Sequence, residues 1–290
     1  MIEPRKQKIL RYILVGPARS GTTVTHLALK GHPNVSAVRD EVRIDPLFTQ
    51  GMGAFTTSGK TYLSEQEQEN HISAIFDAIT TLEADQNTIA SGLKIAVSSP
   101  KLASQLVECL QTYMKDITII LTVREDIVAQ YGSGLRSRAT GQSHSWRKAK
   151  GNGDFTVNIA EDKFVSYANE ILNVLEVLQK LKSTHQVIEI NYEKNILPNM
   201  YEAYYKLFEA LGLPQVEISW LNSSKVAPPP EEYILNYVNL RDILEQIKKG
   251  ESEKLLNQFT KSKPVTSYQS NSNFTKLKSK VKKIISVIRE

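Results

Sequence analysis

Cysteine is nearly absent from this sequence of 290 residues, because Cys109 is the only one. A single cysteine excludes an intramolecular disulfide and a metal site built from several cysteines. Long apolar runs are also missing. No stretch approaches the roughly twenty apolar residues that a membrane-spanning helix needs, and the first residues contain no apolar run long enough for a signal peptide. We therefore expect a cytoplasmic protein.

Charge of one sign is in modest excess. Lysine and arginine total 36 against 31 aspartate and glutamate residues, so the formal net charge is +5. Part of this excess lies in the C-terminal stretch "TKLKSKVKKIISVIRE". A basic balance favours anionic partners, such as nucleotides, sulfated or phosphorylated glycans, nucleic acids or a membrane surface, but does not choose among them.

Short apolar runs alternate with amphipathic segments along the chain. The run "DITIILTVRED" is the clearest strand, and its continuous core, rich in β-branched residues, indicates burial on both faces of a parallel sheet. The run "QVIEINYE", residues 186–193, predicts another buried strand. The alternation predicts an α/β fold of three layers with a central, mainly parallel sheet. We expect one domain over residues 1–263, a polar linker over 264–274 and a basic amphipathic helix over 275–290.

The most informative motif is "YILVGPARSGTT", residues 12–23, in which an apolar strand leads through a turn to the hydroxyl residues that open a helix. Gly16 and Gly21 allow a tight backbone path, and the start of the helix offers N–H groups and a partial positive charge. These features predict an anion site in a P-loop-like fold. The lysine of a nucleotide triphosphatase loop is missing after Gly21, and Arg19 supplies the cation instead. The hydroxyl donors are Ser20, Thr22 and Thr23.

The segment "PARSGTT" resembles the 5′-phosphosulfate loop of sulfotransferases that use 3′-phosphoadenosine 5′-phosphosulfate (PAPS), whose signature is Pro-Lys/Arg-Ser-Gly-Thr-Thr. The resemblance implies a PAPS-dependent sulfotransferase that needs no metal. It also implies that Arg19 contacts the bridging oxygen and the 5′-phosphate. The residues that would cradle this phosphate are Ser20, Gly21, Thr22 and Thr23.

A second motif, "LTVREDIVAQYGSGLRS", has an arginine at the end of a strand and a serine on the next helix. It resembles the site in which sulfotransferases hold the 3′-phosphate, which implies that role for Arg124 and Ser133. The spacing between the two residues is one longer than in cytosolic animal enzymes. It is similar to the spacing in bacterial nodulation-factor and trehalose sulfotransferases.

Weaker resemblances supply the remaining candidate residues. "HPNV…RDE" is similar to a segment in which bacterial and glycan-directed members carry an acidic base, which implies Glu41 as the general base. Asp40 and His144 are its competitors. "GLKIAV" resembles a strand with a lysine near the reacting sulfate, which implies that role for Lys94. "INYEKN" resembles a strand end whose tyrosine lies beside the adenine, which implies that role for Tyr192.

The resemblance implies transfer of a sulfuryl group to a hydroxyl of a carbohydrate or glycolipid, with no nucleic acid partner. Two alternatives stay open. The segment "AFTTSGKT", residues 54–61, matches a relaxed P-loop with Lys60 in place and would indicate a nucleotide kinase or triphosphatase, although no buried strand precedes it. The basic helix predicted over 275–290 would also suit a non-catalytic protein that binds 3′-phosphoadenosine 5′-phosphate (PAP) or a membrane surface. That helix could instead contact the protein itself or another copy.

Overall fold

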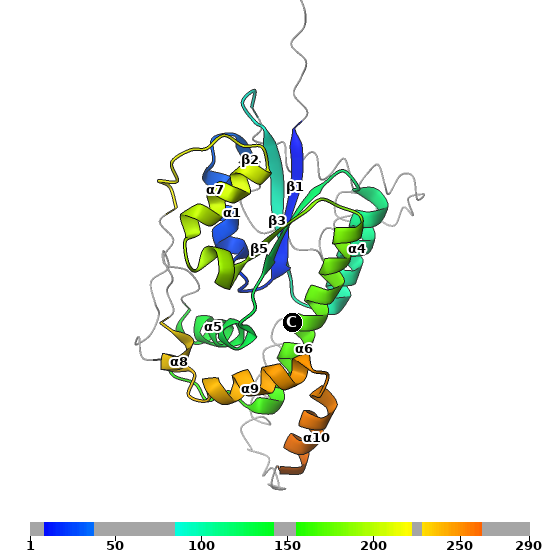
Figure 1. Ribbon diagram of the computed structural model, residues 1–290, viewed down its shortest axis with the longest axis vertical. Helices are drawn as coiled ribbons and strands as arrows, with labels where there is room; N and C mark the ends of the chain where they lie inside the picture. The colour runs from blue at the N-terminus through cyan, green and yellow to red at the C-terminus, as the bar shows by residue number, and fades with distance from the viewer. Residues whose placement is uncertain (1–8, 38–84, 142–154, 222–227, 263–290) are drawn as a thin grey trace, which may run out of the picture.

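The computed structural model describes residues 9–37, 85–141, 155–221 and 228–262 (Figure 1). Its centre is a sheet of five strands in the order β2-β3-β1-β4-β5, and every pairing among them is parallel. The strands are β1 (Leu10–Pro17), β2 (Val35–Ala37), β3 (Ala90–Val97), β4 (Thr118–Val123) and β5 (Val187–Asn191). The parallel sheet predicted from the alternating pattern is confirmed.

Helices cover both faces of this sheet, which gives the expected three layers. The first helices in the described chain are α1 (Thr22–Gly31), α4 (Pro100–Tyr113), α5 (Ile127–Thr140) and α6 (Glu161–Gln179). They are followed by α7 (Met200–Ala210), α8 (Pro230–Tyr233), α9 (Tyr237–Lys248) and α10 (Ser252–Ser262). In Figure 1, α1 and α7 lie on one side of the sheet and α4 and α6 on the other, whereas α5, α8, α9 and α10 lie beyond one end of the strands.

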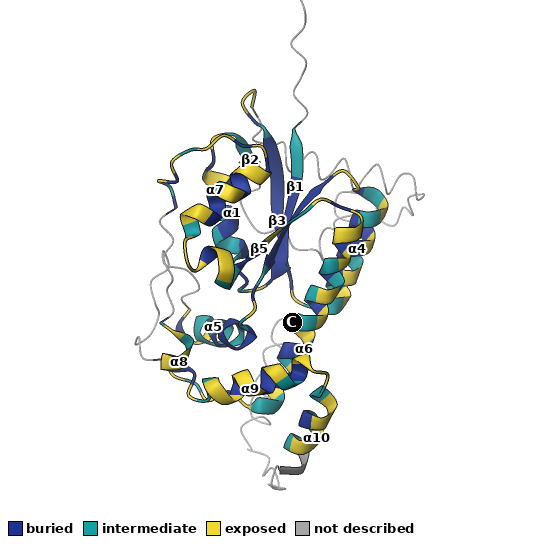
Figure 2. Ribbon diagram, in the orientation of Figure 1, coloured by how far each residue is buried: buried dark blue, intermediate teal, exposed yellow. Residues whose placement is uncertain are grey.

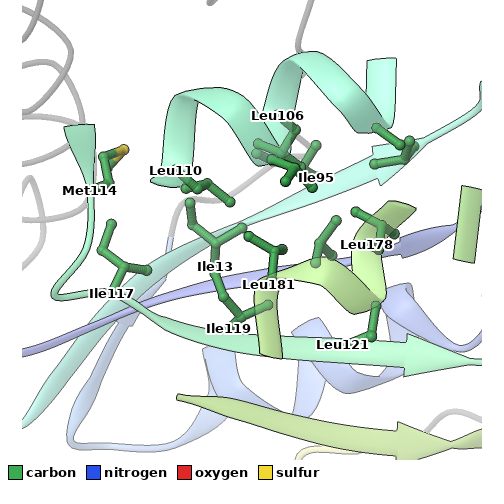
Figure 3. Close-up of a cluster of buried hydrophobic side chains, with 14 of the residues drawn as sticks. Ile13, Ile95, Leu106, Leu110, Met114, Ile117, Ile119, Leu121, Leu178 and Leu181 are labelled. Atoms are coloured by element: carbon green, nitrogen blue, oxygen red, sulfur yellow. The ribbon is translucent and has the colours of Figure 1, made fainter. Parts of the chain in front are cut away.

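The central strands are buried on both faces because their side chains alternate between two cores. Ile13 and Val15 of β1 pack with α4 and α6, in a cluster that Figure 3 shows. Tyr12 and Leu14 of the same strand pack with α1 and α7. The buried strands and the exposed outer faces of the helices are visible in Figure 2. None of the described helices is both long and apolar enough to cross a membrane.

The strand predicted over residues 186–193 is shorter and less buried than expected. β5 ends at Asn191 and lies at the edge of the sheet, so Glu189 is exposed. A single π-helical turn, η3 (Tyr192–Ile196), follows. The Asn191 side chain begins this turn by accepting a hydrogen bond from the Lys194 N–H at 3.0 Å. This local cap ends the strand at Asn191, two residues before its predicted end.

A third apolar cluster joins α5 to the helices that follow the sheet. It contains Ile127 and Val128 of α5, Phe164 of α6 and Ile234 with Leu240 from the α8–α9 region. Gly132 allows a close approach in this cluster, because an added Cβ atom would lie 2.4 Å from Ile234 Cδ1. The linker and basic helix predicted over 264–290 lie outside the described residues.

Replacing Gly16 by alanine should destabilise the protein. An added Cβ would lie 2.2 Å from Thr122 Oγ1 and 2.6 Å from the Thr122 carbonyl oxygen, and a backbone atom cannot easily give way. We expect a loss of about 1–3 kcal/mol in the free energy of unfolding, measured by urea titration. Gly134→Ala is the control, since nothing lies within 4 Å of its added Cβ on α5. This change should stabilise the helix by about 0.5–1 kcal/mol, so equal midpoints for the two variants would contradict the packing argument.

Candidate functional site

The loop between β1 and α1 has a tightly constrained backbone. Arg19 has a φ of 66°, the one positive φ among the described residues other than glycine, and Gly21 has a φ of 96°. A Cβ on Gly21 would also lie 3.0 Å from Ile196 Cδ1 and 3.1 Å from Tyr192 Cδ2. Gly21 therefore provides both the backbone conformation and the close approach of η3 to the loop.

Ser20 fixes this loop to the sheet. Its side chain is fully buried, and its hydroxyl donates to the Pro17 carbonyl at 2.7 Å. The same oxygen lies 2.8 Å from Thr122 Oγ1 on β4. These bonds give the Ser20 hydroxyl a structural partner on each side, so the contact with a phosphate that the resemblance implied for Ser20 stays a prediction.

The N-terminus of α1 favours an anion. Gly21 is the N-cap residue and supplies no side-chain cap, and the first turn contains no acidic residue. Lys94 of β3 is 6% exposed, and its ammonium group donates to Thr23 Oγ1 at 3.3 Å. The Lys94 charge and the positive end of the helix dipole therefore act at the same place. Lys94 and Thr23, which the sequence suggested separately, are brought together.

The two sequence motifs meet at Arg19 and Ser133. Arg19 Nε and Nη2 donate to Ser133 Oγ at 3.1 and 2.9 Å. Ser133 lies in the second turn of α5, directly after the Gly132 that packs on Ile234. The predicted 5′-phosphosulfate loop and the predicted 3′-phosphate motif thus form one continuous site.

Arg124 follows β4 and is held from three directions. Its Nη1 donates to the Arg19 carbonyl at 3.1 Å and its Nε donates to Glu193 Oε1 at 3.2 Å. Its guanidinium carbon lies 4.6 Å from the centre of the Tyr192 ring. Burial lowers the pKa of Arg19 from its ordinary value, and the positive charge of Arg124 lowers it further. Two guanidinium groups in one partly buried site favour an anionic ligand.

Tyr192 and Glu193 come from the η3 turn. Tyr192, predicted beside adenine, lies against Gly21 and Arg124. Glu193 was not predicted, yet it accepts from Arg124 and from the Glu125 N–H, the latter at 2.9 Å. The only signal for Glu193 was its place next to Tyr192.

Gln130 of α5 lies within the second motif, but the sequence suggested no role for it. Its Nε2 donates to the Ala18 carbonyl at 2.7 Å. A signal for it was present, because residues three positions apart share a helix face and Gln130 precedes Ser133 by three.

Several predicted residues are not tested by the structure. The candidate bases Glu41, Asp40 and His144 lie outside the described residues, as does the alternative loop with Lys60. The described site therefore contains the residues predicted for PAPS. The assignment of a general base on the acceptor side stays a prediction.

Comparison with known proteins gives a family match over most of the chain. The model of a family described as "Sulfotransferase family" matches residues 12–217. No curated protein matches the sequence significantly. Similar solved structures include a sulfotransferase from Alicyclobacillus acidocaldarius, with 12% identity, a TM-score of 0.44 and coverage of 88% of this chain and 97% of that one. The sulfotransferase domain of a Synechococcus olefin synthase has 14% identity, a TM-score of 0.44 and coverage of 90% and 98%.

Proposed function

The chain belongs to the sulfotransferase family, and on this premise we propose that it transfers the sulfuryl group of PAPS to a hydroxyl of a carbohydrate or glycolipid. The observation that carries the proposal is the contact of Arg19 with Ser133 at 2.9 Å. It joins the loop at the N-terminus of α1 to the motif around Arg124. A nucleotide with a phosphosulfate at one end and a phosphate at the other suits such a pair of anion sites.

Bound PAPS would supply the sulfuryl group, and the protein would align it and stabilise charge. Sulfuryl transfer is analogous to phosphoryl transfer, in which the transferred group is loosely bonded in the transition state. Negative charge would then develop on the leaving oxygen. Arg19, Lys94 and the N-terminus of α1 would stabilise that charge, because fixed dipoles and cations need little reorganisation. Arg124 and Ser133 would hold the 3′-phosphate, and Tyr192 would lie beside the adenine.

On the acceptor side we propose Glu41 as the general base. A hydroxyl must lose its proton as it attacks sulfur, and the base must lie on the side opposite the leaving oxygen. We propose that no metal takes part, since Arg19 and Lys94 can supply the positive charge that Mg²⁺ provides in a kinase. The proposed compartment is the cytoplasm, and residues 275–290 are the segment proposed for peripheral membrane contact.

The function can be tested with the purified full chain. We expect calorimetry to detect PAP binding, and labelled PAPS to transfer its sulfur label to a member of a panel of saccharides and glycolipids. Transfer should persist with a chelator present. Undetectable PAP binding would contradict the proposal. Mg²⁺-dependent consumption of ATP would instead favour the kinase interpretation of the Lys60 loop.

Arg124→Ala should weaken binding of PAP about 10- to 100-fold, because a charge-assisted hydrogen bond to a phosphate is lost. The matched ligand is adenosine 5′-phosphate, which lacks the 3′-phosphate. The affinity of the protein for adenosine 5′-phosphate should change much less on this substitution. Calorimetry with both ligands on both proteins gives the comparison. Equal losses for the two ligands would mean that Arg124 acts only by holding the Arg19 carbonyl.

A further inference from the structure

Two consecutive carbonyl groups of the β1–α1 loop are bound by side chains from the same β4–α5 segment. Gln130 Nε2 donates to the Ala18 carbonyl at 2.7 Å, and Arg124 Nη1 donates to the Arg19 carbonyl at 3.1 Å. These carbonyls lie on either side of the Arg19 Cα, whose φ is 66°. An unfavourable backbone conformation persists only when its surroundings hold it. The two side chains help to hold it, together with the bonds that Ser20 makes to Pro17 and Thr122.

Gln130 is an energetically unfavourable residue at its buried position in the folded state. Its side chain is 1% exposed, and its Oε1 atom is buried without a hydrogen-bond partner among the described residues. The amide cannot be turned over to correct this, because Oε1 would then face the Ala18 carbonyl oxygen. A buried acceptor without a partner destabilises the folded state, and an apolar side chain of the same shape would avoid this cost. The Ala18 carbonyl would lose its donor in the same change, but Ala18 is exposed, so water can replace that donor. Stability alone therefore does not explain a glutamine here.

The bond to the Ala18 carbonyl sets the direction of a whole peptide group. In a planar trans peptide the N–H points opposite to the C=O. Since Gln130 draws the Ala18 carbonyl towards α5, the Arg19 N–H is directed to the other side of the loop. The same bond keeps a carbonyl oxygen, which would repel an anion, turned towards α5.

We propose that Gln130 is a positioning residue, which orients the Ala18–Arg19 peptide so that the loop can bind the phosphosulfate of PAPS. This inference rests on the proposed function, because it takes the loop as the phosphosulfate site. Gln130 acts through the loop backbone and the Arg19 side chain that follows it. It is distinct from Arg124 and Ser133, to which the 3′-phosphate is assigned above.

The test uses Gln130→Met, which keeps an unbranched side chain of similar size and removes the amide. We expect about tenfold weaker PAP binding by calorimetry, the upper range for one hydrogen bond. The KM for PAPS should rise more than kcat falls. The thermal midpoint should stay equal or rise, because the unpaired Oε1 is also removed. Gln111→Met is the control, since Gln111 on α4 makes a single side-chain bond to Thr184 at 3.3 Å, and its PAP affinity should not change.

Hydrogen exchange of the free proteins adds a second measurement. In Gln130→Met, faster exchange should be confined to the loop at residues 18–20. Unchanged PAP affinity would overturn the inference, and so would a lower midpoint with faster exchange throughout the core, which would assign Gln130 to packing. A wild-type protein that binds no PAP would instead contradict the proposed function, so the two failures are distinguishable.

Discussion

Arg19→Ala is expected to lower kcat/KM for sulfuryl transfer by about 100-fold or more, as losing one preorganised donor to a developing negative charge does in other enzymes. The variant removes a cation at the N-terminus of α1 and both hydrogen bonds to Ser133. It also removes one of the two guanidinium groups of the site. PAP affinity should fall as well, but by less than kcat/KM, because the full charge on the leaving oxygen exists only in the transition state.

The control for this experiment is Lys30→Ala, which removes the same charge from the exposed last turn of the same helix. Its kinetic constants should match those of the wild type within experimental error. Steady-state rates with labelled PAPS and calorimetry with PAP give the two readouts. A large loss of PAP affinity with unchanged kcat in Arg19→Ala would assign Arg19 to binding alone.

Glu41→Gln is expected to lower kcat by about 100- to 10,000-fold, the range for a lost general base. The glutamine keeps the shape of the side chain but cannot accept the proton of the acceptor hydroxyl. PAP binding should be retained, because the residues assigned to PAPS lie elsewhere in the chain. Single-turnover measurement of label transfer, with calorimetry on the same preparation, separates chemistry from binding.

Asp40→Asn and His144→Ala accompany Glu41→Gln, since these residues compete for the same role. We expect both variants to keep most of the wild-type rate. If Glu41→Gln is fully active and one of the other two is not, the base is that residue. This outcome would leave the assignments of Arg19 and Arg124 untouched.

Local sequence was enough to predict the sheet. β4 could be predicted because its run is rich in β-branched residues and its burial on both faces leaves no polar alternation to confuse the pattern. β5 was predicted too long, because the side-chain cap that Asn191 makes to Lys194 competes with the strand and is not visible in hydropathy. In an edge strand such local bonds can replace the hydrogen bonds of the sheet, since an edge strand has only one neighbouring strand.

The site was predicted in parts and not as a whole. The loop and the Arg124–Ser133 motif each have a local signature, but their contact joins residues 114 positions apart. The sequence suggests no role for Gln130 or Glu193, because their partners are backbone groups and Arg124 in other segments. The direction of a backbone carbonyl is a property of the folded loop. Such residues become recognisable only when the two segments are seen together.

The packing of Gly132 on Ile234 has a consequence for the boundary of the catalytic unit. The family match ends at residue 217, after every described residue assigned to PAPS. However, Ser133 adjoins the point where α5 rests on Ile234, and the apolar face of α5 is covered by Tyr233, Leu240 and neighbouring residues. A chain ending at 217 would keep all these binding residues and the contact of α5 with Phe164 of α6, but it would lose the cover that Tyr233, Ile234 and Leu240 provide. We therefore expect the stable folding unit to extend beyond the region that the family model matches.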